Sequence, residues 1–535
     1  MNKEIKTDYC IIGGGIAGIL LASKLVSSGK KILIIDQGPR FSEEDRANFL
    51  LKSKQDINDF ADYNDDVDPS IVTPLSSETS GDGVVEWINY RLFGLGGTAL
   101  HFEGIMMRPI KEDMKVKSLF GYGRDWPISY AELEPWLLEA EYEVGVSGNN
   151  DNPYASSRSG SFPMPGHSFS YFDSEILGPA LKKLGIIGHS CPRAVNSIPY
   201  RGRSGCLACR ACKFCPSGAR YSPDRVHLPL LEKHENVSIM DTLSVRKLET
   251  NSKGNKIVAA HAKHIEDKSD VSISAQNFIV AMGGIETPRM LFLSADNNIH
   301  KAGLGNMGGQ LGVGFSDHDG NYVTFDIGKP VGSRLGYETM VSDHFRKNIN
   351  RTMQPTFTIF ASPAMDWFPI GNEATMWSTQ QKILSIDEIK ASLPNMATLS
   401  IMTESEGKGF LELDKEKKDA FGDPIAKITM KLTEWDRKVH TKFAEFVPAI
   451  AKAMEAKMFS ELTSPGWGIG YHPSGATAMA MDPDEGVCDK NLKVFGLENL
   501  HIVSNSVFPH MASNPPTLTI AALALRLAAH LKGKK

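Results

Sequence analysis

The chain has 535 residues, of which 41% are hydrophobic and 23% charged, as expected of a folded protein with roughly two to four domains. Its net charge of −5 is small for this length and favours neither nucleic acid nor an anionic membrane as a partner. No run reaches about 18 uninterrupted apolar residues, and residues 1–8 do not resemble a signal peptide, so the sequence taken alone predicts a cytoplasmic protein.

The first forty residues follow the pattern of a dinucleotide-binding unit. Residues 9–12 and 31–35 are short apolar runs typical of buried parallel strands, and residues 19–27 between them have helical periodicity. Three glycines with the spacing G-x-G-x-x-G separate the first strand from the helix: Gly13, Gly15 and Gly18. A tight turn without a ligand is the alternative to dinucleotide binding, and the second strand with its closing acid argues against it.

Each residue of this motif has a physical role. Gly13 permits the tight turn, Gly15 lets a pyrophosphate approach the backbone, and Gly18 lets the helix pack on the sheet. The free N–H groups at the start of the helix attract phosphate. Asp36 closes the second strand, where it accepts hydrogen bonds from ribose hydroxyls and disfavours the extra phosphate of NADP.

Residues 93–102 form a second glycine-rich stretch, of a kind that lets a bulky group approach the backbone. Here the chain resembles the glucose–methanol–choline (GMC) oxidoreductases, FAD enzymes in which a G-G-[ST]-x-x-[HN] loop lies over the flavin. The resemblance implies that Gly96, Gly97, Thr98 and His101 contact the flavin. In the pyranose-oxidase branch the histidine matching His101 can be covalently joined to the flavin; a histidine satisfied within the core is the alternative.

Two further stretches strengthen the resemblance. Residues 278–289 have the form of the family's second signature, in which a buried strand enters the pair Gly283 and Gly284 beside the FAD and a helix is expected to begin near Pro288. Residues 123–127 read G-R-D-W-P, which is common in bacterial sugar dehydrogenases of this family. A capping box, Ser-x-x-Glu at 129–132, follows and predicts a helix that runs to residue 144.

Four of the seven cysteines fall within ten residues: Cys206, Cys209, Cys212 and Cys215. This clustering indicates a site rather than a disulfide framework. Thiolates spaced two residues apart wrap closely around an iron–sulfur cluster, whereas zinc usually takes two C-x2-C pairs that are well separated. An iron–sulfur cluster is therefore predicted, with zinc and unligated thiols as the alternatives.

The segment that ends in C-P-x-G-A-x-Y, residues 215–221, resembles the catalytic subunits of the bacterial glucose dehydrogenase and glucoside 3-dehydrogenase branch. Glucose dehydrogenase spaces its cysteines differently, with an adjacent pair, and uses three of them for a 3Fe–4S cluster. The even spacing here leaves open a 3Fe–4S cluster with one spectator cysteine or a 4Fe–4S cluster with four ligands.

The resemblance implies the GMC fold, of α/β (overall α+β) class. A Rossmann-like FAD-binding domain is expected over residues 1–318 and again over 465–535, interrupted by a substrate domain over 319–464 whose antiparallel sheet covers the reactive face of the flavin. His318 lies at the exit from the first FAD segment and is interpreted as structural. Residues 41–83 are charged and irregular, and form either a lid or a mobile insertion.

Within the substrate domain, amphipathic helices are expected at about 385–393 and 434–457. Trp367, Phe368 and Trp377 could stack on a sugar ring, but core packing is the default interpretation of such aromatic residues.

The C-terminal residues return to the flavin. His472 matches the family's catalytic histidine, and a neutral histidine has a suitable pKa for removing a hydroxyl proton near pH 7. Asn514 matches the second active-site position, where its amide would hold the substrate oxygen. Pro515 and Thr517 follow at the start of a helix whose N-terminal dipole would face the flavin.

Together these features imply an FAD-dependent dehydrogenase that oxidises a sugar or glycoside, at glucose C1 or glycoside C3, with His472 as the base. A flavin takes two electrons and an iron–sulfur cluster carries one, so a cytochrome-type acceptor is expected. Relatives in this branch work with a small, signal-bearing export subunit, which predicts periplasmic delivery. A pyranose-oxidase-like flavin oxidase with a structural cysteine site is one alternative, and a redox sensor or assembly protein that retains FAD without turnover is another.

Overall fold

The structure is a computed structural model that describes residues 3–48, 77–82, 91–209, 211–212, 215–296, 299–332, 338–363, 392–459 and 472–533. Strand β1 (Lys3–Ile12) and strand β2 (Ile32–Ile35) pair in parallel, and helix α1 (Ile16–Leu25) connects them. The apolar run of β2 is buried along its whole length, as expected of a strand covered on both faces. The predicted strand–glycine turn–helix–strand unit is thereby confirmed.

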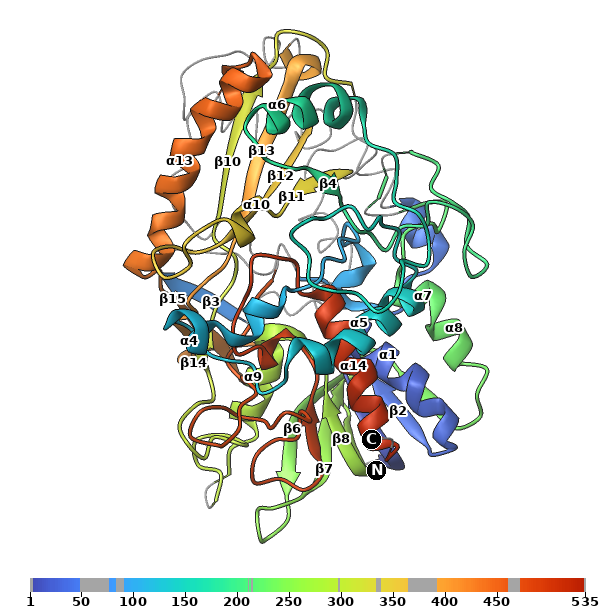
Figure 1. The fold of residues 1–535 in the computed structure, drawn as a ribbon. Coiled ribbons are helices and arrows are strands. Elements are labelled where there is room, and N and C mark those ends of the chain that lie inside the picture. Colours follow the sequence, from blue (N-terminus) through green and yellow to red (C-terminus); the bar gives the residue numbers. More distant parts are fainter. Residues whose placement is uncertain are drawn as a thin grey trace.

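This unit belongs to a seven-stranded sheet with the order β5-β2-β1-β8-β7-β6, to which β17 adds by pairing with β8. The other strands of the sheet are β5 (Val237–Met240), β6 (Leu243–Thr250), β7 (Ile257–His264), β8 (Asp270–Val280) and β17 (Leu500–Ile502). Strand β1 pairs in parallel with both β2 and β8, while β6, β7 and β8 are antiparallel. Helix α14 (Thr517–Leu531) packs against α1 and α5 (Tyr130–Val144), and the two termini lie side by side (Figure 1).

A second sheet has six strands, all paired antiparallel, in the order β16-β10-β13-β12-β11-β4. Their bounds are β4 (His189–Ser190), β10 (Gly320–Asp326), β11 (Met340–Ser342), β12 (Phe357–Pro363), β13 (Met396–Thr403) and β16 (Lys457–Met458). The long helix α13 (Glu434–Met454) runs along this sheet (Figure 1). Because β4 precedes residue 319, the sheet takes one strand from the segment predicted to bind FAD; the domain boundaries stay a prediction.

The third sheet, of mixed direction, has the order β3-β15-β14-β9, with β3 (Ser77–Gly81), β9 (Val313–Phe315), β14 (Gly409–Lys418) and β15 (Pro424–Met430). Helix α9 (Gly283–Leu293) packs on it. The described residues also include five short α-helices: α4 (Val116–Phe120), α6 (Gly178–Lys183), α7 (Pro223–Val226), α8 (Leu228–Leu231) and α10 (His344–Lys347). No helix among the described residues has both the length and the apolar character that crossing a membrane requires.

The sequence predicted the start of α5 correctly and the start of α9 incorrectly. Ser129 caps α5 by accepting a hydrogen bond from the backbone N–H of Glu132, which confirms the predicted capping box. The helix expected near Pro288 begins earlier, at Gly283, and Pro288 lies inside it. That prediction was wrong because Gly283, at φ +73°, turns the chain into a helix three residues after β8 ends.

Some predictions fall on parts of the chain that the structure does not describe. These are Trp367, Phe368, Trp377, most of the helix expected at 385–393 and most of the stretch 41–83. The helix expected at 434–457 is α13, which ends at Met454.

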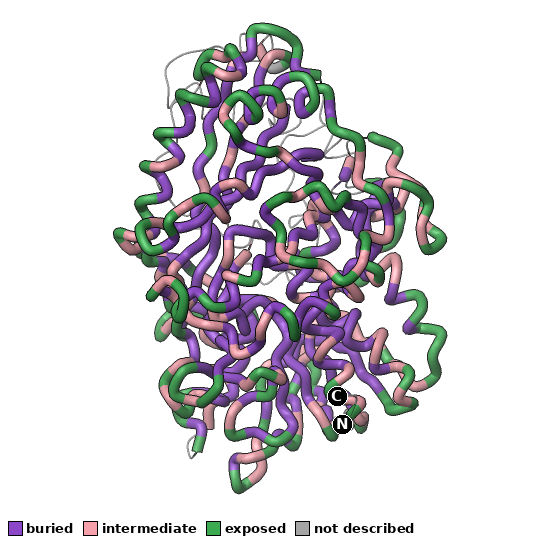
Figure 2. The backbone as a smooth tube through the Cα atoms, in the orientation of Figure 1, coloured by how far each residue is buried: buried purple, intermediate pink, exposed green. Residues whose placement is uncertain are grey.

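The two larger sheets have separate hydrophobic cores. Purple, buried backbone follows the strands of both sheets in Figure 2, with exposed backbone on the outer loops. The core of the six-stranded sheet includes Phe325, Phe357 and Phe443, each fully buried. Phe443 of α13 meets Phe357 of β12 edge-on, with ring centroids 6.5 Å apart, so this ring fixes the helix to the sheet.

Replacing Phe443 with Ala should lower the free energy of unfolding by about 3–5 kcal/mol, because it leaves a cavity between α13 and β12. Chemical denaturation followed by circular dichroism measures the loss. Glu445→Ala, at an exposed position of the same helix, is the control and should change stability by less than about 0.5 kcal/mol. Equal stability of the two variants would contradict the assigned packing.

Candidate functional site

The glycine turn after β1 leaves no room for side chains except at one position. A Cβ at Gly13 would lie 2.4 Å from the carbonyl oxygen of Ala281, and one at Gly18 would lie 2.1 Å from the carbonyl oxygen of Gly13. At Gly15, the N-cap of α1, the nearest described heavy atom to such a Cβ is Gly97 Cα at 3.9 Å. The turn is therefore held by backbone contacts and leaves room for a phosphate beside the helix N-terminus, which fits a dinucleotide.

Asp36 lies beside this turn at the end of β2, as predicted. Its two carboxylate oxygens accept hydrogen bonds from the backbone N–H groups of Gly14 (2.7 Å) and Gly38 (2.8 Å). Burial raises the pKa of Asp36 to about 6, and the two N–H donors oppose that rise. The carboxylate is thus held next to the phosphate cradle, where a ribose is expected.

The second glycine-rich stretch lies directly on the first. The backbone N–H of Gly96 donates to the carbonyl of Gly14 over 2.8 Å, and a Cβ at Gly97 would lie 3.0 Å from Gly15 Cα. A single turn of 3₁₀ helix, Gly97–Leu100, then carries Thr98, and His101 ends it by donating its backbone N–H to the Thr98 carbonyl. Residues 80 positions apart in sequence thus form one backbone surface, as expected of a flavin-binding loop.

Helix α9 connects this surface to the C-terminal segment. A Cβ at Gly284 would lie 1.9 Å from the carbonyl oxygen of Pro473, whereas Gly283 has no heavy atom of the described residues within 4 Å of its own Cβ position. The N–H of Ala281 donates to Ile12, at the end of β1. Of the predicted positions, Gly284 therefore adjoins Pro473, the residue that follows His472, while Gly13 adjoins Ala281.

His472 lies between residues 316–318 and the start of α9. Its backbone N–H donates to Asp317 Oδ1 over 3.1 Å, and its ring meets the edge of the His318 ring, with centroids 5.0 Å apart. Burial, and secondarily His318, lower the pKa of His472 well below its usual range. Burial also lowers the pKa of His318 to about 4, while its Nδ1 lies 2.6 Å from the carbonyl oxygen of Thr403. Both imidazoles are therefore neutral near pH 7.

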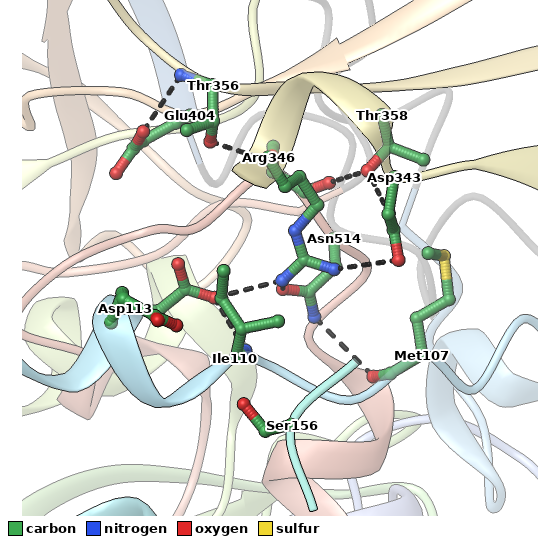
Figure 3. Close-up of polar contacts among 12 residues, drawn as sticks. Met107, Ile110, Asp113, Ser156, Asp343, Arg346, Thr356, Thr358, Glu404 and Asn514 are labelled. Carbon is green, nitrogen blue, oxygen red and sulfur yellow. Dashed lines mark hydrogen bonds and ion pairs between the residues drawn. The ribbon is translucent and has the colours of Figure 1, made fainter. Parts of the chain in front are cut away.

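Asn514 is 4% exposed and has a defined orientation. Its Oδ1 accepts a hydrogen bond from Arg346 Nη2 over 3.1 Å, and its Nδ2 donates to the carbonyls of Pro515 (3.1 Å) and Met107 (3.5 Å). In Figure 3 the guanidinium of Arg346 lies over the Asn514 amide, between two acidic residues. Arg346 comes from the short helix α10 and was not identified from the sequence, since nothing in its neighbourhood follows a motif.

Buried carboxylates hold Arg346 and its neighbour Arg351. Arg346 pairs with Asp113 (2.9 Å) and Asp343 (3.3 Å), and Arg351 pairs with Asp113 (2.6 Å) and Glu404 (3.1 Å). Although burial opposes it, Arg351 holds the pKa of Glu404 well below its usual range, helped by His510 at 2.7 Å. Asn514 is therefore oriented by a network of buried charges.

Three of the four clustered cysteines lie together. Cys212 and Cys215 are buried with Val195 and Ala219, Cys206 packs against them, and Cys209 is exposed. Backbone N–H groups donate to two of the sulfurs, from Ala208 to Cys206 (3.4 Å) and from Arg220 to Cys215 (3.2 Å). Among the described residues, no three His, Cys, Asp or Glu side chains are arranged to hold a single metal ion. Cysteine thiols and N–H···S hydrogen bonds are groups of the chemical type that surround an iron–sulfur cluster.

Arg220 connects the cysteine run to the second glycine-rich stretch, which is predicted to contact the flavin. Its guanidinium donates to the carbonyls of Ala99 (2.7 Å) and Leu100 (2.6 Å), while its backbone N–H donates to the sulfur of Cys215. The side chain is buried, with its cation 5.2 Å from the centre of the Phe102 ring. The motif C-P-x-G-A-x-Y leaves this position unspecified, so it did not indicate these contacts of Arg220.

The glycine turn between β1 and α1 and the carboxylate of Asp36 beside it indicate a protein that binds a dinucleotide. Models of the GMC oxidoreductase family match residues 94–335 and 405–524, and a model of NAD(P)-binding Rossmann-like domains matches residues 11–47. The chain belongs to the GMC oxidoreductase family and is an FAD-dependent oxidoreductase.

The chain is 30% identical to the fructose dehydrogenase large subunit of Gluconobacter japonicus, over 98% of both proteins. It is 22% identical to the gluconate 2-dehydrogenase flavoprotein of Pantoea cypripedii, over 98% of this chain and 93% of that protein. A solved structure of pyridoxine 4-oxidase from Mesorbium loti shares the fold, with a TM-score of 0.65 at 18% identity, over 98% of this chain and 99% of that one.

Two glycine substitutions, at the N-cap of α1 and within its first turn, separate cofactor binding from folding. Gly15→Ala should leave the thermal stability of the apoprotein unchanged but weaken FAD binding by about tenfold or more, because the new methyl occupies the phosphate approach. Gly18→Ala should instead destabilise the apoprotein by about 1–3 kcal/mol, since its methyl meets the Gly13 carbonyl. Thermal melting and FAD titration measure both effects. Normal FAD affinity in Gly15→Ala would contradict the assigned cradle.

Proposed function

We propose that this protein is a dehydrogenase that oxidises a hydroxyl of a sugar or glycoside, with His472 as the base and Asn514 as the ligand of the substrate oxygen. The observation that carries the proposal is the neutral, buried ring of His472 at the junction of α9 with the cofactor cradle. The relatedness to a fructose dehydrogenase large subunit supports a sugar substrate. Glucose C1, glycoside C3 and a fructose hydroxyl are the candidate positions.

In this mechanism the bound FAD supplies a hydride acceptor at flavin N5. His472 accepts the hydroxyl proton. Burial keeps its ring neutral, so the imidazole does not have to lose a proton before it acts as the base. Arg346 occupies Oδ1 of Asn514, so the amide offers its N–H side. The hydrogen bond from Asn514 Nδ2 to the Met107 carbonyl is long, at 3.5 Å. The N–H that makes it is therefore the donor available to the substrate oxygen.

Electron export is proposed to run through an iron–sulfur cluster held by Cys206, Cys212 and Cys215. The grouping of these three and the exposure of Cys209 favour a 3Fe–4S cluster, with a four-ligand 4Fe–4S cluster as the alternative. Such a cluster carries one electron at a time, which suits a cytochrome-type acceptor. The name of the related large subunit supports a multisubunit assembly, so a small export subunit and periplasmic delivery are proposed, with a cytoplasmic location as the alternative.

A flavin oxidase with a structural cysteine site is the competing function. Rapid peroxide formation from a sugar, in protein that contains neither iron nor sulfide, would favour it over the dehydrogenase.

Replacing His472 with Ala should lower the rate of flavin reduction by about 10²–10⁴-fold without loss of bound FAD, because the base is removed. Stopped-flow reduction with D-fructose, D-glucose and methyl β-D-glucoside measures it. His530→Ala, at the exposed end of α14, is the control and should react normally.

The pH dependence follows from the lowered pKa of His472. Its neutral form is the active base and predominates above that pKa, so the reduction rate should stay level from pH 8 to 6.5 and fall only at lower pH. A decline centred at or above pH 6.5 would contradict this environment.

Single Cys→Ser substitutions separate the cluster types. Substituting Cys206, Cys212 or Cys215 should abolish the iron content and the EPR signal, whereas Cys209→Ser should retain both. The three cluster-free variants should still reduce their flavin with sugar but fail to pass electrons to cytochrome c. Loss of the cluster in all four variants would instead establish the four-ligand form, and retention in all four would refute the site.

A further inference from the structure

A cavity of about 510 Å³ opens beside Asn514. Residues 106–110 and 149–162 form its walls, and its buried end carries His189, Asp343 and Arg346. It is distinct from the glycine cradle, since none of the lining belongs to the predicted cofactor-binding residues.

Two of the residues that line the cavity also contact Asn514. Arg346 donates to Asn514 Oδ1, and the carbonyl of Met107 accepts from Asn514 Nδ2. Figure 3 shows the Arg346 guanidinium and the Met107 carbonyl beside the Asn514 amide, with Ser156 close to Ile110. A ligand in the cavity is therefore one residue away from the proposed site of oxidation.

The buried end has an unsatisfied hydrogen-bonding group. His189 is 1% exposed, and its Nδ1 lies 3.1 Å from the carbonyl oxygen of Ser190, which assigns a hydrogen to Nδ1. Its Nε2 lies 3.5 Å from Asp343 Oδ2 and makes no hydrogen bond within the part of the chain that the structure describes. Asp343 already accepts hydrogen bonds from Asn152 and Thr358, so Nε2 of His189 is the atom at the buried end that a hydroxyl group of a ligand would bond.

The charges around the cavity exclude an anionic ligand. Arg108 pairs with Glu134 (2.7 Å), Arg158 with Glu141 (2.7 Å) and Arg346 with Asp343 (3.3 Å). Each arginine of the lining is thus neutralised by a carboxylate, which leaves no cation to receive a phosphate or a sugar acid.

The remaining lining suits a carbohydrate. The mouth carries amide and hydroxyl groups, and the inner wall has buried apolar side chains that match the C–H surface of a sugar. These lining residues are Asn150, Ser157, Ser159 and Ser161 at the mouth, and Met106, Met107 and Ile110 on the inner wall.

We propose that this cavity binds the hydroxyl groups of a neutral sugar or glycoside that are remote from the carbon being oxidised, with Nε2 of His189 as their hydrogen-bonding partner at the buried end. The inference rests on the proposed function, whose site it extends by a specificity subsite.

Two variants and one control test the subsite. His189→Phe keeps the ring volume but removes Nε2, and Ser161→Trp narrows the mouth from an exposed position. Each should raise KM for the reactive sugar about tenfold, with the limiting rate of flavin reduction changed less than about threefold and FAD content intact. Ser168→Trp, also exposed but outside the cavity, is the matched control and should keep the normal KM.

Sugar binding is also measured without turnover, by saturation-transfer NMR with D-fructose, D-glucose and methyl β-D-glucoside on the oxidised holoenzyme. Binding of any of these sugars that Ser161→Trp abolishes and Ser168→Trp preserves supports the subsite, even if no sugar reduces the flavin and the proposed function fails. An unchanged KM or NMR signal in both cavity variants overturns the subsite while leaving the function intact. Absence of sugar binding, or tighter binding of D-gluconate than of neutral sugars, also overturns it.

Discussion

The contact between two glycine-rich backbones, Gly14–Gly15 after β1 and Gly96–Gly97 eighty residues later, is the constraint on which the site depends. The hydrogen bond from Gly96 to Gly14 and the 3.0 Å clearance at Gly97 require that no side chain intervene. The other segments proposed to bind the cofactor pack around this contact. Helix α9 joins it through Ala281, which meets Gly13, and the His472 segment joins it through Gly284.

The residues around Asn514 are held differently, by buried charge. Removing carboxylates and guanidinium groups from water is costly, and such pairs often add little net stability compared with apolar packing. Here they fix an orientation: with Asp113 and Asp343 on either side, Arg346 directs its N–H group at the amide oxygen of Asn514. An amide in an apolar pocket would have two nearly equivalent orientations, only one of which offers its N–H side to a substrate oxygen. The role of the charge network is therefore to select one orientation of the Asn514 amide rather than to stabilise the fold.

The sequence predicted those elements that short-range patterns specify and missed the contacts between residues far apart in the chain. The unit from β1 to Asp36 follows from short-range periodicity and glycine spacing, and the structure reproduces it. His472 and Asn514 came only from family resemblance, because a lone histidine or asparagine has no physical signature in sequence. Arg346 and His189 could not be found, since Arg346 meets Asn514 across 168 residues and β4 pairs with β11 across about 150. The start of α9 was misplaced because a proline preference outweighed the turn at Gly283.

Arg220 links the loop proposed to carry the flavin to the segment proposed to carry the cluster. Its guanidinium holds the carbonyls of Ala99 and Leu100, and its main chain holds Cys215. The loop proposed to carry the flavin and the segment proposed to carry the cluster therefore cannot shift independently, because both are anchored to one buried side chain. Electron transfer between two centres depends on their separation, and in the proposed electron route this doubly hydrogen-bonded arginine would fix that separation. A lysine, with a single point of donation on a flexible stem, would bind one carbonyl and leave the other buried and unsatisfied.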